Sequence, residues 1–132
     1  MDICVIDGIE YDVIVLEIEE TFNILYSDQT GRTVGIGAPM VLDPLGTFIG
    51  HKVKIKCKKG HEAEYDSLFD FLTTPRYDGI TVKMVHNQTS IEYEAYISNG
   101  ARKVKIIDKD EEKVYWGEMT LNIVPIRAQV TP

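Results

Sequence analysis

Hydrophobic and polar residues alternate along most of the chain, and no other sequence feature constrains the fold as much. A period of two is typical of strands that bury one face and expose the other. The clearest example, residues 51–58, places Val53, Ile55 and Cys57 on one face and lysines on the other. Similar alternation in residues 11–20 and 91–98 predicts further strands. The chain is therefore predicted to be mainly β.

One segment follows a helical period instead. After Gly60, apolar residues fall at i, i+3, i+4 and i+7, at Tyr65, Leu68, Phe69 and Leu72. Thr74-Pro75 should end this helix, because the residue before a proline disfavours helical geometry. With strands on both sides of one helix and 132 residues in all, we expect a single domain over residues 1–132, a β-sandwich or barrel with one flanking α-helix.

Short turn signals separate the predicted strands. Asp7-Gly8 between apolar runs predicts a hairpin, since both residues tolerate positive φ. Turns are also expected near Asn87, at Asn99-Gly100 and in the acidic segment 108–112.

The segment at about 28–50 has no clear period and is rich in Gly and Pro. Such a long irregular connection is unusual inside a compact domain and is often functional. It is also too apolar for a solvated linker, with Val34, Ile36, Met40, Val41, Leu42, Leu45 and Phe48. We expect a long β-hairpin or loop that becomes ordered against a partner.

Charge is distributed unevenly along the chain. The formal net charge is −7, which argues against a protein that coats nucleic acid. Residues 1–20 contain seven acidic side chains and no Lys or Arg, whereas residues 51–60 contain five lysines and no acid. Segments of opposite sign indicate charge pairing, either within the molecule or between copies of it.

No group of residues predicts a metal site or a catalytic site. Cys57, His61, Glu62 and Glu64 are close in sequence, but zinc sites normally show paired ligands, and the chain has no second pair. The acidic segment 108–112 does not fit a calcium loop, because Lys113 and Met119 stand where such a loop needs Gly and Glu.

The histidines and cysteines are also better explained without chemistry. His51, His61 and His86 have no nucleophile motif beside them. Cys4 and Cys57 lie in apolar alternations, which indicates buried thiols in a reducing compartment. We expect no catalytic residue, no metal and no cofactor.

Membrane insertion is not expected either. The longest apolar run, Val13 to Leu16, is far shorter than the ~20 residues that a spanning helix needs. The first residues include Asp2 and Asp7 where a secretory signal would carry positive charge.

Several short motifs occur together along nearly the whole chain. They are Ile6-Asp7-Gly8 with Tyr11, Leu45-Gly46-Thr47, Glu64-Tyr65-Asp66-Ser67-Leu68, Leu72-Thr73-Thr74-Pro75, Ile91 to Ser98, Tyr115-Trp116 and Val124-Pro125. As a set they resemble small tail-module proteins of tailed phages and prophages of Gram-positive bacteria, of the tail-tube-like superfamily. Tail tube, distal tail and baseplate adaptor proteins share that fold.

The resemblance implies a structural role and no enzyme activity. It implies a β-sandwich or barrel with one flanking helix that forms rings by joining sheets edge to edge, while a long hairpin reaches neighbouring subunits. The expected partners are copies of the chain and other phage tail proteins, with no membrane, no sequence-specific nucleic acid, and possible passive DNA passage through a ring lumen. The expected location is the virion tail, after synthesis in the host bacterial cytoplasm.

Together these arguments predict a subunit interface. The residues expected in it are Glu17, Glu19, Arg32, Val34, Ile36, Met40, Leu42, Lys52, Lys54, Lys56 and Lys58. An alternative of another class is a monomeric β-sandwich binding module, for example for carbohydrate. Its binding face would be built from aromatic residues among Tyr11, Tyr26, Tyr77, Tyr96, Tyr115 and Trp116.

Overall fold

The computed structural model describes residues 4–32, 37 and 39–132, and it is mainly β with one helix, as predicted. The elements are β1 (Cys4–Ile6), β2 (Ile14–Tyr26), β3 (Gly31–Arg32), β4 (Met40–Val41), β5 (Pro44–Lys56), α1 (Glu62–Thr73), β6 (Ile80–His86), β7 (Thr89–Asp108) and β8 (Lys113–Pro125). Six strands form one antiparallel sheet in the order β1-β6-β7-β8-β5-β2, and β3 pairs with β4.

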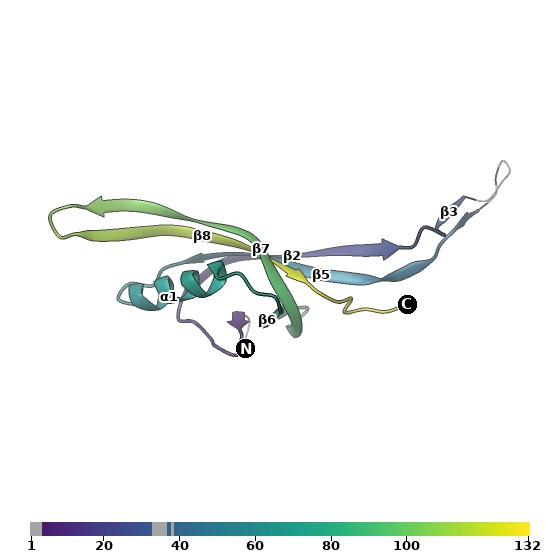
Figure 1. Ribbon diagram of the computed structural model, residues 1–132, viewed down its shortest axis with the longest axis horizontal. Helices are drawn as coiled ribbons and strands as arrows, with labels where there is room; N and C mark the ends of the chain where they lie inside the picture. Colours follow the sequence, from purple (N-terminus) through teal and green to yellow (C-terminus); the bar gives the residue numbers. More distant parts are fainter. Residues whose placement is uncertain (1–3, 33–36, 38) are drawn as a thin grey trace.

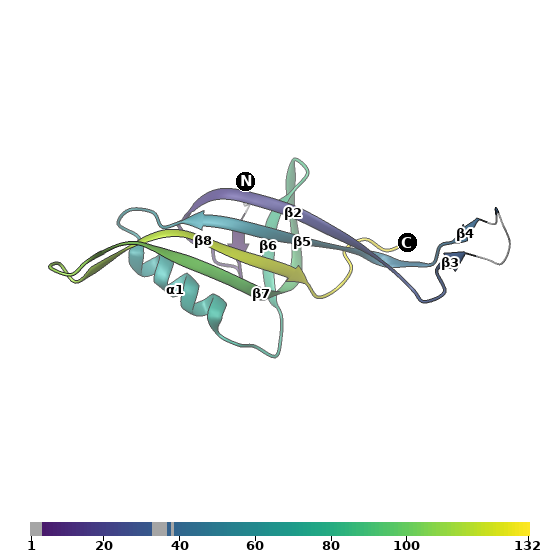
Figure 2. The ribbon, with the colours of Figure 1, turned by 90° about the horizontal axis from the view of Figure 1, so that it is seen from above.

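Two long hairpins give the molecule its shape. The β2–β5 hairpin and the β7–β8 hairpin extend in opposite directions from a central body (Figures 1 and 2). In the body, β5 pairs with β8 between His51↔Ile123 and Lys56↔Glu118. The described residues between 21 and 50 lie beyond this paired region at one end and are called the β2–β5 arm. Residues 103–117 lie beyond it at the other end and are called the β7–β8 arm.

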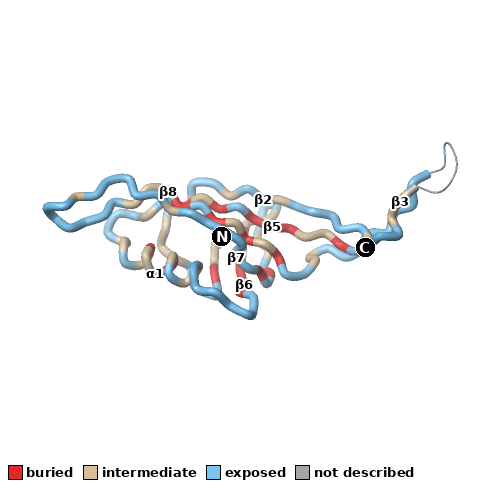
Figure 3. Tube along the Cα trace, turned by 45° about the horizontal axis from the view of Figure 1, so that its top comes forward, coloured by how far each residue is buried: buried red, intermediate tan, exposed pale blue. Residues whose placement is uncertain are grey.

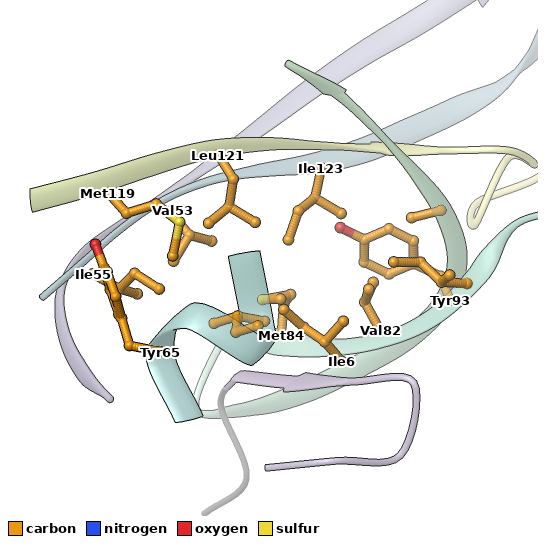
Figure 4. Packing of buried hydrophobic residues seen from close by; sticks show 13 residues of the cluster. Ile6, Val53, Ile55, Tyr65, Val82, Met84, Tyr93, Met119, Leu121 and Ile123 are labelled. Atoms are coloured by element: carbon orange, nitrogen blue, oxygen red, sulfur yellow. The ribbon is translucent and has the colours of Figure 1, made fainter. Parts of the chain in front are cut away.

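The sheet bends because β7 belongs to two parts of it. The first part of β7 pairs with β6, and the part from Ala95 onward pairs with β8. Strands β1 and β6 therefore form a second layer under β5 and β8, and Val82 and Met84 point toward Leu121 and Ile123 (Figure 4). The two layers come from one continuous sheet, and no ladder joins β1 to β2 in the described residues.

The core lies between these layers and α1. Tyr65 and Leu68 of α1 are fully buried in it, and Phe69 and Leu72 pack partly against it, which confirms the predicted apolar stripe. Burying a Leu side chain contributes about 1.5–3 kcal/mol, so this stripe is enough to hold the helix on the sheet. The helix ends as predicted, with the Thr74 amide bonded to the Phe71 carbonyl. No helix in the described part of the chain is long and apolar enough to cross a membrane.

The start of the strand predicted at 51–58 is wrong. Strand β5 begins at Pro44, not near His51, and residues 44–50 pair with residues 21–26 of β2. Gly46 interrupts the hydrophobic pattern there because the C-terminal segment passes very close. A Cβ on Gly46 would lie 2.7 Å from the Ala128 Cβ. The expected long hairpin is present, while residues 33–36 and 38 lie outside the described residues.

The predicted turn at Asn99-Gly100 is also wrong, because β7 runs through both residues as one strand of twenty. Positive φ occurs in the predicted turns at Asp7 (52°), Gly8 (76°) and Asn87 (54°) but not at Asn99 or Gly100. Gly100 serves close packing instead. A Cβ there would lie 2.8 Å from the Thr120 carbonyl oxygen of the paired strand.

Candidate functional site

Strand β2 presents a free edge. Twelve of its thirteen residues pair with β5 on one side, and no described strand pairs with its other side. The backbone N–H and C=O groups on that side form a row of unpaired donors and acceptors. Such an edge can accept another strand, and monomeric proteins usually shorten, cover or charge it.

Strand β7 presents a second free edge. Its residues from Ile97 to Asp108 pair with β8 on one side, whereas β6 pairs only with residues 89–95. In the described residues nothing pairs with the remaining side of Ile97–Asp108. This edge runs along the body and then along the β7–β8 arm (Figure 2).

The two edges bound one four-stranded unit, β7-β8-β5-β2. Because every neighbour in this unit is antiparallel, β2 and β7 run in opposite directions. Two copies placed side by side in the same orientation would therefore bring β2 of one antiparallel to β7 of the other. That geometry extends the existing sheet without reversing any subunit, which is what a head-to-tail ring requires.

Both arms expose apolar side chains. Figure 3 shows buried positions in the body and mostly exposed ones along the arms. On the β2–β5 arm the exposed apolar residues are Phe22, Ile24, Leu25, Tyr26, Met40, Val41, Leu42 and Leu45. On the β7–β8 arm they are Val104, Ile106, Ile107, Val114 and Tyr115. Apolar surface on this scale marks an interaction site more often than an isolated exposed residue does.

The predicted acidic and basic stripes meet within one chain. Glu17 lies opposite Lys54 and Glu19 opposite Lys52 across the β2–β5 ladder. The Lys54 Nζ is 3.9 Å from a Glu17 carboxylate oxygen and 3.8 Å from one of Glu118. Of the two kinds of charge pairing expected from the sequence, the one within the molecule is therefore present. Glu17, Glu19, Lys52 and Lys54 line a hollow of about 370 Å³ on the sheet face away from the core.

The other predicted interface residues are spread over the molecule. Lys56 lies opposite Glu118 on β8, and the Lys58 Nζ is 3.1 Å from an Asp12 carboxylate oxygen. Arg32, in β3, and Met40 and Leu42, at and after β4, belong to the β2–β5 arm. Val34 and Ile36 lie outside the described residues.

Sequence reasoning missed the β7 edge entirely, including Gly100 and Lys103. Had Asn99-Gly100 been taken as part of a strand, the alternation of Lys103 and Lys105 with Val104 would have indicated a basic strand long enough to form an edge.

A cluster of ionisable side chains lies at the start of α1. Of the residues weighed as metal ligands, His61 and Glu64 come together, and they are joined by Asp12. The His61 Nδ1 is 3.3 Å from an Asp12 oxygen and 3.5 Å from a Glu64 oxygen, and the Asp12 amide donates to Glu64 at 2.7 Å. Lys58 also reaches Asp12, so these charges already have partners. These contacts hold the segment before β2 against the helix.

The two cysteines are free thiols that are only partly buried. Burial, with a smaller contribution from Glu10, raises the pKa of the Cys4 thiol to about 11. Burial likewise raises the pKa of Cys57, assisted by the negative charge of Glu62. Both thiols are therefore protonated and weakly nucleophilic at neutral pH.

A polar network in the body holds β2 to the second layer. His51 is fully buried, its Nδ1 is 2.6 Å from the Tyr93 hydroxyl, and its Nε2 is 3.1 Å from Glu20 and 3.0 Å from the Val85 carbonyl. Burial raises the pKa of Tyr93, so its hydroxyl keeps its proton and donates to Nδ1. His51 then donates from Nε2 toward the two acceptors. His86 completes the network at 2.8 Å from Glu20.

The chain matches no protein-family model, and no curated protein is significantly similar to it. Its function is therefore inferred from the two free edges, the exposed arms and the sequence motifs described above.

Proposed function

We propose that this chain is a structural ring or adaptor subunit of a phage or phage-derived tail, in the tube or baseplate, that assembles by sheet contacts between subunits. One observation carries the proposal, namely the pair of long free edges, β2 and β7, that run in opposite directions at the two sides of one four-stranded unit. The sequence motifs supply the tail context.

The free edges and the arms support assembly over a monomeric role. A monomer that leaves thirteen residues of edge strand unpaired risks uncontrolled association, whereas a ring removes both edges at once. The contact is heterologous, since it joins different surfaces of two identical chains, and such contacts close into rings when the rotation between copies permits it. The apolar arms would then reach beyond the immediate edge contact to neighbouring subunits.

The proposed partners are copies of this chain and other tail proteins, and the proposed location is the virion tail. No catalytic step is assigned to the chain. In a ring with α1 on the outside, the hollow lined by Glu17, Glu19, Lys52 and Lys54 would face the lumen. A surface that carries both acidic and basic side chains suits passive passage of DNA better than binding to it.

The test is the mass of the purified protein in solution, followed by imaging of any large species. Light scattering over a range of protein and salt concentrations should detect oligomers, and electron microscopy should show rings or tubes. Ile24→Lys on β2 should weaken assembly, while the control Ile9→Lys, outside the arms, should not. The two residues are comparably exposed, at 41% and 51%, so both variants should fold. A protein that stays monomeric up to its solubility limit would contradict the proposal.

The carbohydrate-binding alternative finds little support in where the aromatic residues lie. Tyr26 is at the end of β2 in one arm and Tyr115 is in β8 in the opposite arm, so they cannot share one sugar-binding face. Trp116 packs against Tyr65 at the helix, with ring centroids 6.2 Å apart. A strict monomer that binds glycans saturably would favour this alternative.

A further inference from the structure

We propose that β2 of one copy pairs with β7 of a second copy in one antiparallel register, which places Phe22 opposite Gly100. The occupant of the β7 edge is therefore a second copy of this chain. This inference rests on the proposed function and adds to it the register and the anchoring side chain.

Phe22 is an apolar side chain without cover. It is 74% exposed, and only Tyr77 exceeds it among the described large hydrophobic residues. It lies opposite Ile49 in the β2–β5 ladder, and directly opposed residues share a face of the sheet. Because Ile49 is buried, this is the face that carries the core. Phe22 thus points toward the layer of α1 and β6 but lies past the end of the body.

The β7 edge offers a matching hollow. Between this edge and α1 lies a hollow of about 250 Å³, and Gly100 is part of its lining together with the apolar side chains of Phe69, Leu72, Ile97, Met119 and Leu121. Gly100 pairs with the buried Leu121, so it also faces the core layer. Glycine leaves bare backbone there, and an aromatic ring from an adjacent strand commonly covers such a glycine.

Charge and packing together favour this register over its neighbours. With Phe22 opposite Gly100, Glu19 meets Lys103 on the polar face, and both side chains are exposed. A shift of two residues in one direction would set Glu19 against Ala101. The opposite shift would set Phe22 against Arg102.

The Arg102 side chain already fills the space next to this position of β7. The Arg102 guanidinium lies 3.7 Å from the Phe69 ring centroid and 3.8 Å from that of Trp116. The shift toward Arg102 is therefore unfavourable for an incoming aromatic ring.

The register also gives a reasonable stagger between copies. Within one chain, pairing leads from Gly100 to Leu121, then to Val53 and then to Ile18. In the proposed register Ile18 lies opposite Val104 of the next copy. Following the pairing across the four strands of one copy therefore leads from Gly100 to Val104, a shift of four residues along β7. A register shift of one residue per strand is also found in closed barrels that have eight strands and a shear number of eight. The strands of such barrels tilt by about 36°. The repeat is therefore compatible with a closed ring.

Disulfide trapping tests the register directly. In a background with Cys4→Ala and Cys57→Ala, we would compare Thr21→Cys/Ala101→Cys with Thr21→Cys/Lys103→Cys under mild oxidation. Thr21 and Ala101 are opposed in the proposed register, whereas Lys103 is displaced by two residues. Because β8 and β5 separate the two positions within a chain, a disulfide can form only between copies.

We expect the matched pair to give a ladder of linked multimers on a non-reducing gel and the displaced pair to give little. Stronger linking of the displaced pair, or assembly without linking of either pair, would overturn the register but leave the proposed function intact. A protein that neither assembles nor links would contradict both proposals. Circular dichroism would confirm that each variant is folded.

A second pair of variants tests the anchor. Phe22→Ser should raise the protein concentration needed for assembly by roughly tenfold or more, as expected when a central aromatic anchor is removed. Tyr77→Ser is the matched control, because Tyr77 is also an exposed aromatic residue but lies on neither edge. Equal effects of the two substitutions would contradict the assignment of Phe22.

Discussion

Tyr93 shows how a single buried hydroxyl can fix the position of an edge strand. Its hydroxyl donates a hydrogen bond to the Nδ1 of His51, and the Nε2 of His51 donates to Glu20 of β2. Tyr93→Phe keeps the ring but leaves the buried Nδ1 without a donor, and an unsatisfied buried polar group costs about 1–3 kcal/mol. We expect a loss of stability of that size in urea unfolding. Tyr96→Phe, on the exposed side of the same strand, should change stability by less than about 0.5 kcal/mol; an equal loss in both variants would contradict the network.

Cys4 should make the fold sensitive to alkaline pH. Burial raises its pKa from 9.0 to about 11, so the folded protein keeps the thiol protonated while the unfolded chain ionises from pH 9 upward. The stability that this thiol contributes is present in full below pH 9 and is lost as the pH rises toward 11. Thermal unfolding between about pH 8 and about pH 11 should show a smaller decrease for Cys4→Ala than for the wild type. Parallel curves for the two proteins would show that Cys4 is not involved.

At the scale of elements, the sequence predicted the features that depend only on residues close together in the chain. The helix followed from the spacing of Tyr65, Leu68 and their neighbours, and the Asp7-Gly8 turn followed from two residues that accept positive φ. The errors arose where a glycine serves a long-range contact. Gly46 makes room for the C-terminal segment and Gly100 for the carbonyl of Thr120, and neither partner is close in sequence. The free β7 edge was missed for this reason.

Arg102 joins two elements, α1 and the base of the β7–β8 arm. Its guanidinium lies between the rings of Phe69 and Trp116, and it donates to Asp66 at 2.9 Å. Lysine keeps the charge but not the planar group that stacks on both rings, so Arg102→Lys should lower the free energy of unfolding by about 1–2 kcal/mol.

The fluorescence of Trp116, the single tryptophan, reports on this junction. Its emission should shift to longer wavelength in Arg102→Lys as the ring becomes more exposed to water. Arg127→Lys is a suitable control, because Arg127 is 77% exposed and pairs only with Glu94 among the described residues. An unchanged stability and emission in Arg102→Lys would show that the arm is held by its backbone alone.

At the scale of the whole molecule, the sequence pattern could not show where the core ends. Alternation continues from the body into both arms, so Phe22 and Ile24 have the same pattern as Ile18, which is partly buried earlier in β2. Whether a strand face is covered depends on where the second layer stops, and that layer is formed by β1, β6 and α1 from other parts of the chain. The sequence could therefore predict a long hairpin but not an uncovered arm.

Because most residues of the arms lie outside the core, the role of the arm tips in assembly can be separated from folding. Ser27 and Asp43 close the β2–β5 ladder, with the Ser27 amide donating to the Asp43 carbonyl at 2.9 Å and their side chains also bonded. Replacing residues 28–42 by Asn-Gly would remove the tip of the arm and suits a two-residue hairpin turn. None of the described residues in the removed segment belongs to the hydrophobic core cluster. We therefore expect the free energy of unfolding to change by less than about 1 kcal/mol.

Assembly should respond differently, because the deletion removes Arg32, Val34, Ile36, Met40 and Leu42, which the sequence places in the interface. If the tip reaches a neighbouring subunit, the shortened protein should form smaller or fewer oligomers in light scattering. The β2 and β7 edges remain, so Thr21→Cys/Ala101→Cys should still link shortened copies. Full-size rings from the shortened protein would restrict the interface to the edges, whereas loss of both oligomers and disulfide linking would show that the tip is needed before the edges can pair.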